Sequence, residues 1–308
     1  MESFLLFSQA LPSQNLGFVN SKVSSLELTI VGKDLVIHQS PTILSSNRAA
    51  GTTGAGKLTH HDEHCSGSYA DYYLAVVWKV TPLVAEWIAS AQNILFRHGI
   101  LNINSTVLEL GCGISGIVAL ALGPNIGKYV ATDQGYTLKL LKQNIAENAP
   151  NLARPSHRNQ KRDDNIPTKA VRAACSTATG NIHIMALDWE LDSLSILPKI
   201  LKAEDLDVTG PASGGVDAVI ACDCVYNETL IEPLVKTCVD ICRLRHDTPE
   251  HKPTLCIVAQ QLRSPDVFEA WLLAFYNAFH VWRMPDSLLT EGLKESSGFV
   301  VHVGTLRN

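Results

Sequence analysis

The sequence has no apolar run long enough to cross a lipid bilayer, which takes about 20 residues in a helix. It also has no basic excess, because 25 Lys and Arg residues stand against 30 Asp and Glu residues and give a net charge of −5. The composition therefore gives no indication of nucleic-acid binding. Residues 1–7 lack the basic segment that opens a secretory signal. We expect neither DNA nor a membrane as a partner.

A disulfide framework is also missing. The eight cysteines are scattered, and four of them fall within apolar stretches that are typical of strands or helices: Cys222, Cys238, Cys242 and Cys256. Buried, reduced thiols of this kind are usual in reducing compartments. We expect a cytoplasmic monomer, with the nucleus as the alternative location.

The most informative stretch runs over residues 106–133. An apolar strand is followed directly by the sequence GCGISG over residues 111–116, then by an apolar helix over 117–122 and a second strand that ends at Asp133. Residues without a Cβ allow the tight turn and let a ligand contact the backbone. An acid after the second strand can accept hydrogen bonds from ribose hydroxyls. The stretch predicts an α/β fold with an adenosine-bearing ligand above a parallel sheet.

The three glycines alone would also fit a dinucleotide-binding dehydrogenase. Glu109 lies two residues before the first glycine, and a carboxylate there would repel a pyrophosphate but attract a cationic ligand. Glu109 therefore argues against NAD, and a dehydrogenase remains an alternative.

Four sequence blocks, at 107–113, 131–133, 187–189 and 219–226, resemble the seven-strand S-adenosylmethionine-dependent methyltransferases. Within them the chain is similar to the group that methylates lysines of non-histone proteins, whose members carry an acid-x-x-aromatic motif in the last block. The resemblance extends from Trp78 to the end of the chain. It implies a Rossmann-like seven-stranded sheet with an antiparallel last strand, S-adenosyl-L-methionine as the cofactor, and protein-lysine N-methyltransferase activity.

The resemblance also implies roles for individual residues. Asp223 would bind and orient the incoming lysine, and Tyr226 would form a wall of the lysine channel. Asp188 would accept the adenine amino group while Trp189 covers the ring. The complete set implied to bind the cofactor is Trp78, Glu109, Gly111, Cys112, Gly113, Asp133, Asp188, Trp189 and Cys222. We expect no metal.

The chain is expected to have two parts. Residues 1–77 form an N-terminal extension whose alternating stretches at 26–31 and 34–38 predict a hairpin. In the family such a hairpin helps to cover the cofactor. We also predict an insertion at 56–75, because in the family the segment that resembles residues 53–55 runs almost directly into the Trp78 block.

Residues 78–308 form the expected methyltransferase domain. Apolar residues at helical intervals predict one amphipathic helix over 78–98. Residues 149–179 carry several basic side chains, two prolines and few large apolar ones, which predicts an exposed basic loop insertion.

Two motifs in the extension have other interpretations. Residues 51–57 have the glycine-to-lysine spacing of a phosphate-binding loop, but Leu58 stands where a Ser or Thr would bind magnesium. Residues 60–65 contain metal-ligating side chains but no second ligand pair at a useful spacing. We expect neither a nucleotide site nor a metal site there.

The expected substrate is a protein, with a large-subunit ribosomal protein as one candidate. A small-molecule methyltransferase on the same fold is an alternative. A second alternative is a catalytically impaired cofactor-binding module, in which the insertion at 56–75 has disrupted the cover of the cofactor.

Overall fold

The computed structural model describes residues 2–9, 17–40, 76–149, 177–192, 194, 197, 215–246 and 252–307. The expected insertion at 56–75, the motifs at 51–57 and 60–65, and most of the expected basic loop at 149–179 lie outside these residues. Within the described ranges, no helix is both long and apolar enough to cross a membrane.

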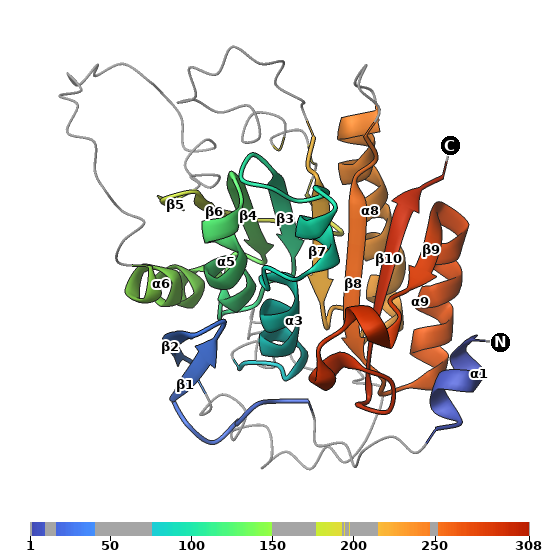
Figure 1. Ribbon diagram of the computed structural model, residues 1–308, viewed down its shortest axis with the longest axis horizontal. Coiled ribbons are helices and arrows are strands. Elements are labelled where there is room, and N and C mark those ends of the chain that lie inside the picture. The colour runs from blue at the N-terminus through green and yellow to red at the C-terminus, as the bar shows by residue number, and fades with distance from the viewer. Residues whose placement is uncertain are drawn as a thin grey trace, which may run out of the picture.

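An eight-stranded sheet runs through the molecule in the order β5-β6-β4-β3-β7-β8-β10-β9 (Figure 1). Five neighbouring strands pair in parallel: β6 (Ile182–Ala186), β4 (Lys128–Asp133), β3 (Thr106–Leu110), β7 (Ala218–Cys222) and β8 (Leu255–Gln261). The last strand, β10 (Phe299–Leu306), is antiparallel to both β8 and β9 (Phe279–Arg283). The predicted seven-stranded sheet is thus confirmed, and β5 (Thr177–Thr179) adds one antiparallel edge strand beside β6.

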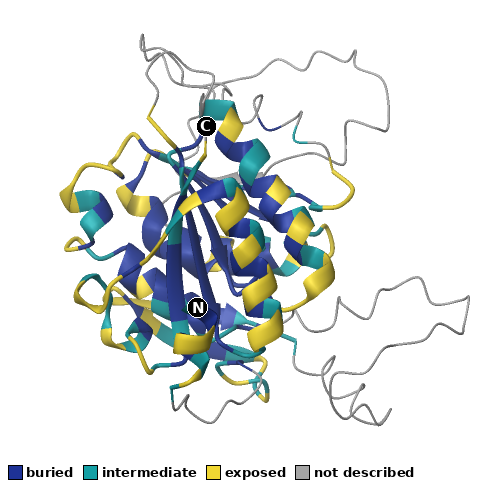
Figure 2. Cartoon of the chain, turned by 90° about the vertical axis from the view of Figure 1, so that its right-hand side faces the viewer, coloured by how far each residue is buried: buried dark blue, intermediate teal, exposed yellow. Residues whose placement is uncertain are grey.

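The parallel strands are buried on both faces, which explains why they read as continuous apolar runs in the sequence. Every residue of β7 is buried, as are the last four residues of β3. Figure 2 shows this buried sheet between two partly exposed helical layers.

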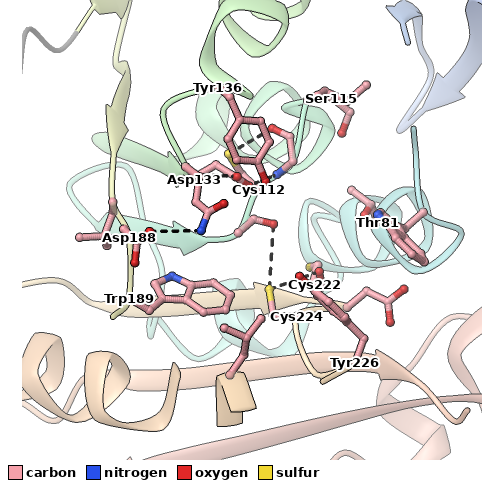
Figure 3. A pocket seen from close by; sticks show the side chains of 18 of the residues that line it. Thr81, Cys112, Ser115, Asp133, Tyr136, Asp188, Trp189, Cys222, Cys224 and Tyr226 are labelled. Atoms are coloured by element: carbon pink, nitrogen blue, oxygen red, sulfur yellow. Dashed lines mark hydrogen bonds between the residues drawn. The ribbon is translucent and has the colours of Figure 1, made fainter. Parts of the chain in front are cut away.

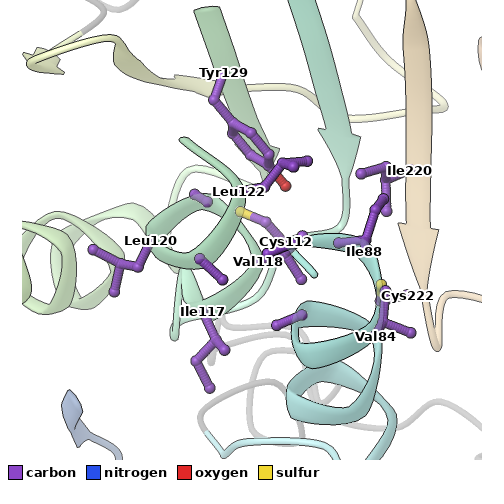
Figure 4. Close-up of a cluster of buried hydrophobic side chains, with 14 of the residues drawn as sticks. Val84, Ile88, Cys112, Ile117, Val118, Leu120, Leu122, Tyr129, Ile220 and Cys222 are labelled. Atoms are coloured by element: carbon purple, nitrogen blue, oxygen red, sulfur yellow. The ribbon is translucent and has the colours of Figure 1, made fainter. Parts of the chain in front are cut away.

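The helices divide between the two faces of the sheet. One layer holds α3 (Val80–Ile88), α4 (Ile94–Arg97), α5 (Ile117–Leu122) and α6 (Leu138–Asn148), and the other holds α1 (Glu2–Phe7), α8 (Ile231–His246) and α9 (Pro265–Ala278). Figure 4 shows how Val84, Ile88 and Val118 pack with Ile220 of β7 in the first of these cores. Short 3₁₀ helices complete the structure: η3 (Gly123–Asn125), η6 (Glu228–Leu230), η7 (Asp286–Leu288) and η8 (Glu291–Leu293).

The continuous helix predicted over 78–98 is wrong. The chain forms α3 and α4 instead, and Asn93 separates them. The Asn93 side chain accepts a hydrogen bond from the Leu95 amide at 2.9 Å and donates one to the Trp87 carbonyl at 2.9 Å. Asn93 thus caps the start of α4 and satisfies a carbonyl at the end of α3, so the apolar periodicity continues while the helix does not.

The predicted N-terminal hairpin is confirmed as β1 (Ser25–Ile30) and β2 (Lys33–His38). It lies beside α6 in Figure 1. Asn144 and Asn148 of α6 accept hydrogen bonds from the backbone amides of His38 and Val36, each at 2.8 Å. These two asparagines satisfy the open edge of β2 and attach the hairpin to the helical layer of the main sheet.

Candidate active site

A cavity of about 590 Å³ lies at the carboxyl ends of β3, β4, β6 and β7 (Figure 3). Its walls are the loops that follow these strands and the segment that enters α3. Ligands of open parallel α/β sheets bind at this edge, because each strand there delivers a loop to the same crevice.

The cavity brings most of the predicted site residues together. Asp223 and Tyr226 line it, and so does each predicted cofactor residue except Glu109. They are Trp78, Gly111, Cys112, Gly113, Asp133, Asp188, Trp189 and Cys222. Residues far apart in the sequence thus meet because four strands end side by side.

The three glycines of the turn serve two different needs. Gly111, Gly113 and Gly116 all have positive φ angles, of 62°, 65° and 60°. A Cβ on Gly111 would lie 2.7 Å from Cys224 Sγ, and one on Gly116 would lie 2.7 Å from the Ile145 side chain. A Cβ on Gly113 would meet no atom within 4 Å. The first and third glycines allow close packing, whereas Gly113 leaves an open backbone surface on the cavity.

Asp133, the last residue of β4, is hydrogen-bonded to the glycine turn. One carboxylate oxygen accepts a hydrogen bond from the Gly113 amide at 2.7 Å, and the other accepts one from the Gln134 amide at 2.7 Å. Burial raises the pKa of Asp133, and these two backbone hydrogen bonds oppose the rise. The carboxylate therefore holds the shape of the turn at the point where a ribose is expected.

Glu109 does not have the surroundings that the sequence suggested. It is buried within β3 and is absent from the residues that line the cavity. The Tyr129 hydroxyl donates a hydrogen bond to its carboxylate at 2.7 Å. Burial raises the pKa of Glu109 to about 7, although the Tyr129 hydrogen bond lowers it. Glu109 thus lies in the core with its carboxylate bonded to Tyr129, and its contact with a cationic ligand stays a prediction.

Replacing Glu109 with Gln is expected to remove part of the pH dependence of stability. Between about pH 4.5 and 7 the folded carboxyl keeps a proton that the unfolded chain has lost, so the free energy of unfolding falls as pH rises through this window. The cost above pH 7 is about 3 kcal/mol. Urea unfolding at pH 5 and pH 8 should show this loss in the wild type and not in Glu109→Gln. An equal loss in both proteins would contradict the assignment.

Asp188 and Trp189 follow β6 at the cavity wall. Asp188 Oδ1 accepts a hydrogen bond from the Glu190 amide at 2.9 Å, and its Oδ2 accepts one from Gln134 Nε2 at 3.2 Å. The Trp189 indole nitrogen is buried and has no hydrogen-bond partner in the described part of the chain. A buried donor without a partner is costly. Trp189 lines the cavity, and the Cζ2 and Cη2 atoms of its ring lie closest to the glycine turn, next to Gly111.

Asp223 lies on the cavity, but its carboxylate already has a partner. The two oxygens accept hydrogen bonds from Arg263 Nη1 at 2.7 Å and Nη2 at 2.5 Å, and Oδ1 also accepts one from the Gln261 amide at 3.2 Å. The Asp223 side chain is only 1% exposed, and its backbone has a φ of 58°. Such a φ is unusual for a residue other than glycine, so the surrounding contacts must hold it.

Sequence reasoning missed Arg263 and several wall residues. Gln134 and Cys224 line the cavity, while Arg263 stands behind Asp223. All three come within two residues of the end of a parallel strand. Their position just after a parallel strand could have predicted a place near the cavity, because the ends of parallel strands lie at the same edge of the sheet.

The thiols of the cavity are buried, which disfavours the thiolate form that a nucleophile needs. Burial raises the pKa values of Cys112, Cys222 and Cys224, so these side chains remain thiols. Cys224 instead packs under the glycine turn, where its Sγ donates to the Leu110 carbonyl at 3.2 Å.

Two further expectations concern the surroundings of the cavity. The family resemblance implied that the β1–β2 hairpin helps to cover the cofactor, but this hairpin contributes no side chain to the cavity lining. Residues 76–78, which lead into α3, line the cavity. Within the described ranges, no group of three or more His, Cys, Asp or Glu side chains could hold a metal ion.

Comparison with known proteins identifies the relatives of this chain. A sequence model of the lysine methyltransferase family matches residues 65–160, which include the glycine turn and Asp133. The chain resembles lysine methyltransferases over this stretch. Ribosomal lysine N-methyltransferase 5 of Saccharomyces cerevisiae is 35% identical over 176 residues, which cover 54% of this chain and 47% of the yeast protein. The family resemblance inferred from the sequence is confirmed, and the chain spans about half the length of the curated relatives it matches.

The similarity to solved structures is weaker. A proposed S-adenosylmethionine-dependent methyltransferase from Streptococcus mutans is 9% identical, with 96% of this chain and 57% of that chain covered and a TM-score of 0.44. The N-methyltransferase NodS of Bradyrhizobium japonicum, solved with S-adenosyl-L-homocysteine, is 11% identical, with 70% and 90% covered and a TM-score of 0.35.

Proposed function

We propose that this protein is an S-adenosylmethionine-dependent protein-lysine N-methyltransferase. The observation that carries the proposal is the single cavity that joins the glycine turn, Asp133 and the Asp188–Trp189 pair to the Asp223–Tyr226 motif. The first group of residues would hold the cofactor, and the Asp223–Tyr226 motif would receive the substrate. Their presence on one cavity suits a reaction in which a bound methyl donor meets an incoming amine. The lysine methyltransferase family match supports the same function.

The residues of the cavity fit S-adenosylmethionine. The open backbone at Gly113 gives a surface that a ligand can touch, and the Trp189 ring on the cavity wall would cover the adenine. Asp133 would accept hydrogen bonds from ribose hydroxyls. The Asp188 carboxylate would accept the adenine amino group. When bound, the cofactor supplies a methyl group on a sulfonium that an amine can displace in line.

The protein has to deliver a neutral amine to that methyl group. A free lysine has a pKa of about 10.4, so it arrives as an ammonium and must lose its proton before it can attack. Tyr226 lies on the same cavity with its ring partly exposed, and it would form an aromatic wall for the lysine chain. Walls that exclude water favour the neutral amine, because desolvation lowers the pKa of a lysine.

A ribosomal protein is the proposed substrate class, with support from the printed name of the yeast relative. The cytoplasm is the proposed location, with the nucleus as the alternative. The six described cysteines are all free and buried, which suits a reducing compartment.

A labelling experiment tests the proposed function. Purified protein is incubated with S-adenosylmethionine tritiated on its methyl group and with salt-washed ribosomal proteins, and the products are hydrolysed in acid. Label in methyllysine is the expected result, and the control is a Gly113→Ala variant, whose cofactor affinity is expected to fall by about a hundredfold or more. Label recovered only in a small molecule, or in no product, would contradict a protein-lysine methyltransferase.

A further inference from the structure

The Asp223–Arg263 ion pair sits where the acid of the acid-x-x-aromatic motif meets the cavity. Both oxygens of Asp223 are engaged by the guanidinium in a bidentate pair. Asp223 follows β7 and Arg263 follows β8, and these strands are parallel neighbours. The sheet therefore brings the two charges together at the edge where substrate is expected.

Arg263 contacts several neighbouring residues, and these contacts fix its orientation toward Asp223. Its guanidinium carbon lies 5.0 Å from the centre of the Trp78 ring, in a cation–π contact. Its Nη2 also donates to Gln261 Oε1 at 2.8 Å. A Cβ on Gly17 would lie 2.3 Å from Nη2, so the backbone at Gly17 closes over the guanidinium.

The segment that carries Gly17 is itself fixed to the cavity wall. The Lys79 amide donates to the Gly17 carbonyl at 2.7 Å, and the Phe18 and Trp78 rings are 4.6 Å apart. Trp78 thus has one neighbour in the N-terminal segment and another in Arg263, while it also lines the cavity.

The pairing changes what a substrate amine would experience. An unpaired carboxylate attracts an ammonium and raises its pKa, which opposes the proton loss that methyl transfer needs. A carboxylate matched by a guanidinium presents no net charge, and the guanidinium adds repulsion toward a second cation. Oδ2 accepts a hydrogen bond from Arg263 Nη2, whereas Oδ1 accepts two, from Arg263 Nη1 and the Gln261 amide.

We propose that Arg263 is a positioning residue that neutralises Asp223, so that the cavity favours the neutral form of the target lysine. The proposal rests on the lysine methyltransferase function proposed above. On this proposal, Asp223 does not act as a free carboxylate that binds the lysine ammonium, but as one member of a charge-matched pair. Arg263 acts through Asp223, because it does not line the cavity itself.

Other ionisable groups also face the cavity, from three further strands as well as β7. The other carboxylates are Asp133, Asp188 and Glu190. The thiols and phenols are Cys112, Tyr136, Cys222, Cys224 and Tyr226. All of them are common to the wild type and the Arg263 variants, so a difference between these proteins reports on the Asp223–Arg263 pair.

The pH dependence of single-turnover methylation tests the proposal. Protein loaded with tritiated S-adenosylmethionine reacts with ribosomal proteins between pH 6.5 and 10. Arg263→Gln leaves Asp223 unmatched, so the acid limb of the rate profile should move up by about 1 to 3 pH units. Arg263→Lys keeps the charge and should stay close to the wild-type profile. A lower rate with an unmoved profile in Arg263→Gln would mean a purely structural role and would overturn the proposal.

A binding measurement decides the question without catalysis. The probe is n-butylamine, titrated by NMR into protein saturated with S-adenosylhomocysteine at pH 7, where the amine is a cation. Arg263→Gln should bind it at least about tenfold more tightly than the wild type, and Asp223→Asn with Arg263→Gln should lose that gain. Equal affinity in the wild type and Arg263→Gln would overturn the proposal. If the wild type labels no lysine, the proposed function fails while this titration still reports on the pair.

Discussion

Asp223→Asn is expected to lower kcat/KM for methyl transfer by about a hundredfold or more, while S-adenosylhomocysteine still binds within about threefold of its wild-type affinity. Asp223 and Tyr226 line the cavity from the segment after β7, whereas the glycine turn and Asp133, which are expected to hold the cofactor, belong to the ends of β3 and β4. Asparagine keeps the shape of the side chain but loses its charge, so Arg263 remains as an unmatched cation. That cation should repel an incoming lysine.

The companion variant Asp223→Asn with Arg263→Gln separates charge from shape. It restores a neutral pair, so it should be less impaired in kcat/KM than Asp223→Asn alone. Thermal melting of both variants shows whether a loss of rate reflects unfolding, because removing one partner of a buried pair is destabilising. A rate near that of the wild type in Asp223→Asn would contradict the role assigned to this residue.

Gly113→Ala is expected to weaken S-adenosylhomocysteine binding by about a hundredfold or more, which corresponds to about 2.7 kcal/mol. The methyl group would stand in the open space over the turn, where no protein atom lies within 4 Å and where the cofactor is expected to contact the backbone. The fold itself should remain, because the substitution meets no protein atom.

Gly99 offers a matched control for the backbone strain of this substitution. Its φ of 66° is close to the 65° of Gly113, and a Cβ there also meets nothing within 4 Å. Gly99→Ala and Gly113→Ala should each cost about 1 to 2 kcal/mol of stability through the left-handed conformation. Only Gly113→Ala should lose affinity in a calorimetric titration. Similar affinities in the two variants would remove Gly113 from the ligand site.

The sheet and most of the cavity were predictable because their sequence signals are local. Apolar strands, the glycine turn and Asp133 occur in one short stretch, and a parallel sheet must bring the ends of its strands to one edge. The same reasoning placed Asp223 at this edge, since it follows a strand, whereas Asp188 was assigned from the family resemblance; both line the cavity.

Three features were not predictable because they depend on tertiary contacts. The pairing of Asp223 with Arg263 joins residues 40 positions apart. The side chain of Glu109 points to the face of β3 that packs in the core. There its carboxylate accepts a hydrogen bond from the Tyr129 hydroxyl. The helix break at Asn93 arises from a side chain that satisfies backbone groups on both sides, which a periodicity of apolar residues does not reveal.

The measurement that tests the central claim most directly is a calorimetric titration of the full chain with S-adenosylhomocysteine and, separately, with NAD⁺. The account predicts one saturable site for S-adenosylhomocysteine that is lost in Gly113→Ala, and no binding of NAD⁺. Binding of NAD⁺ at the glycine turn, or no affinity of the folded protein for S-adenosylhomocysteine, would contradict it.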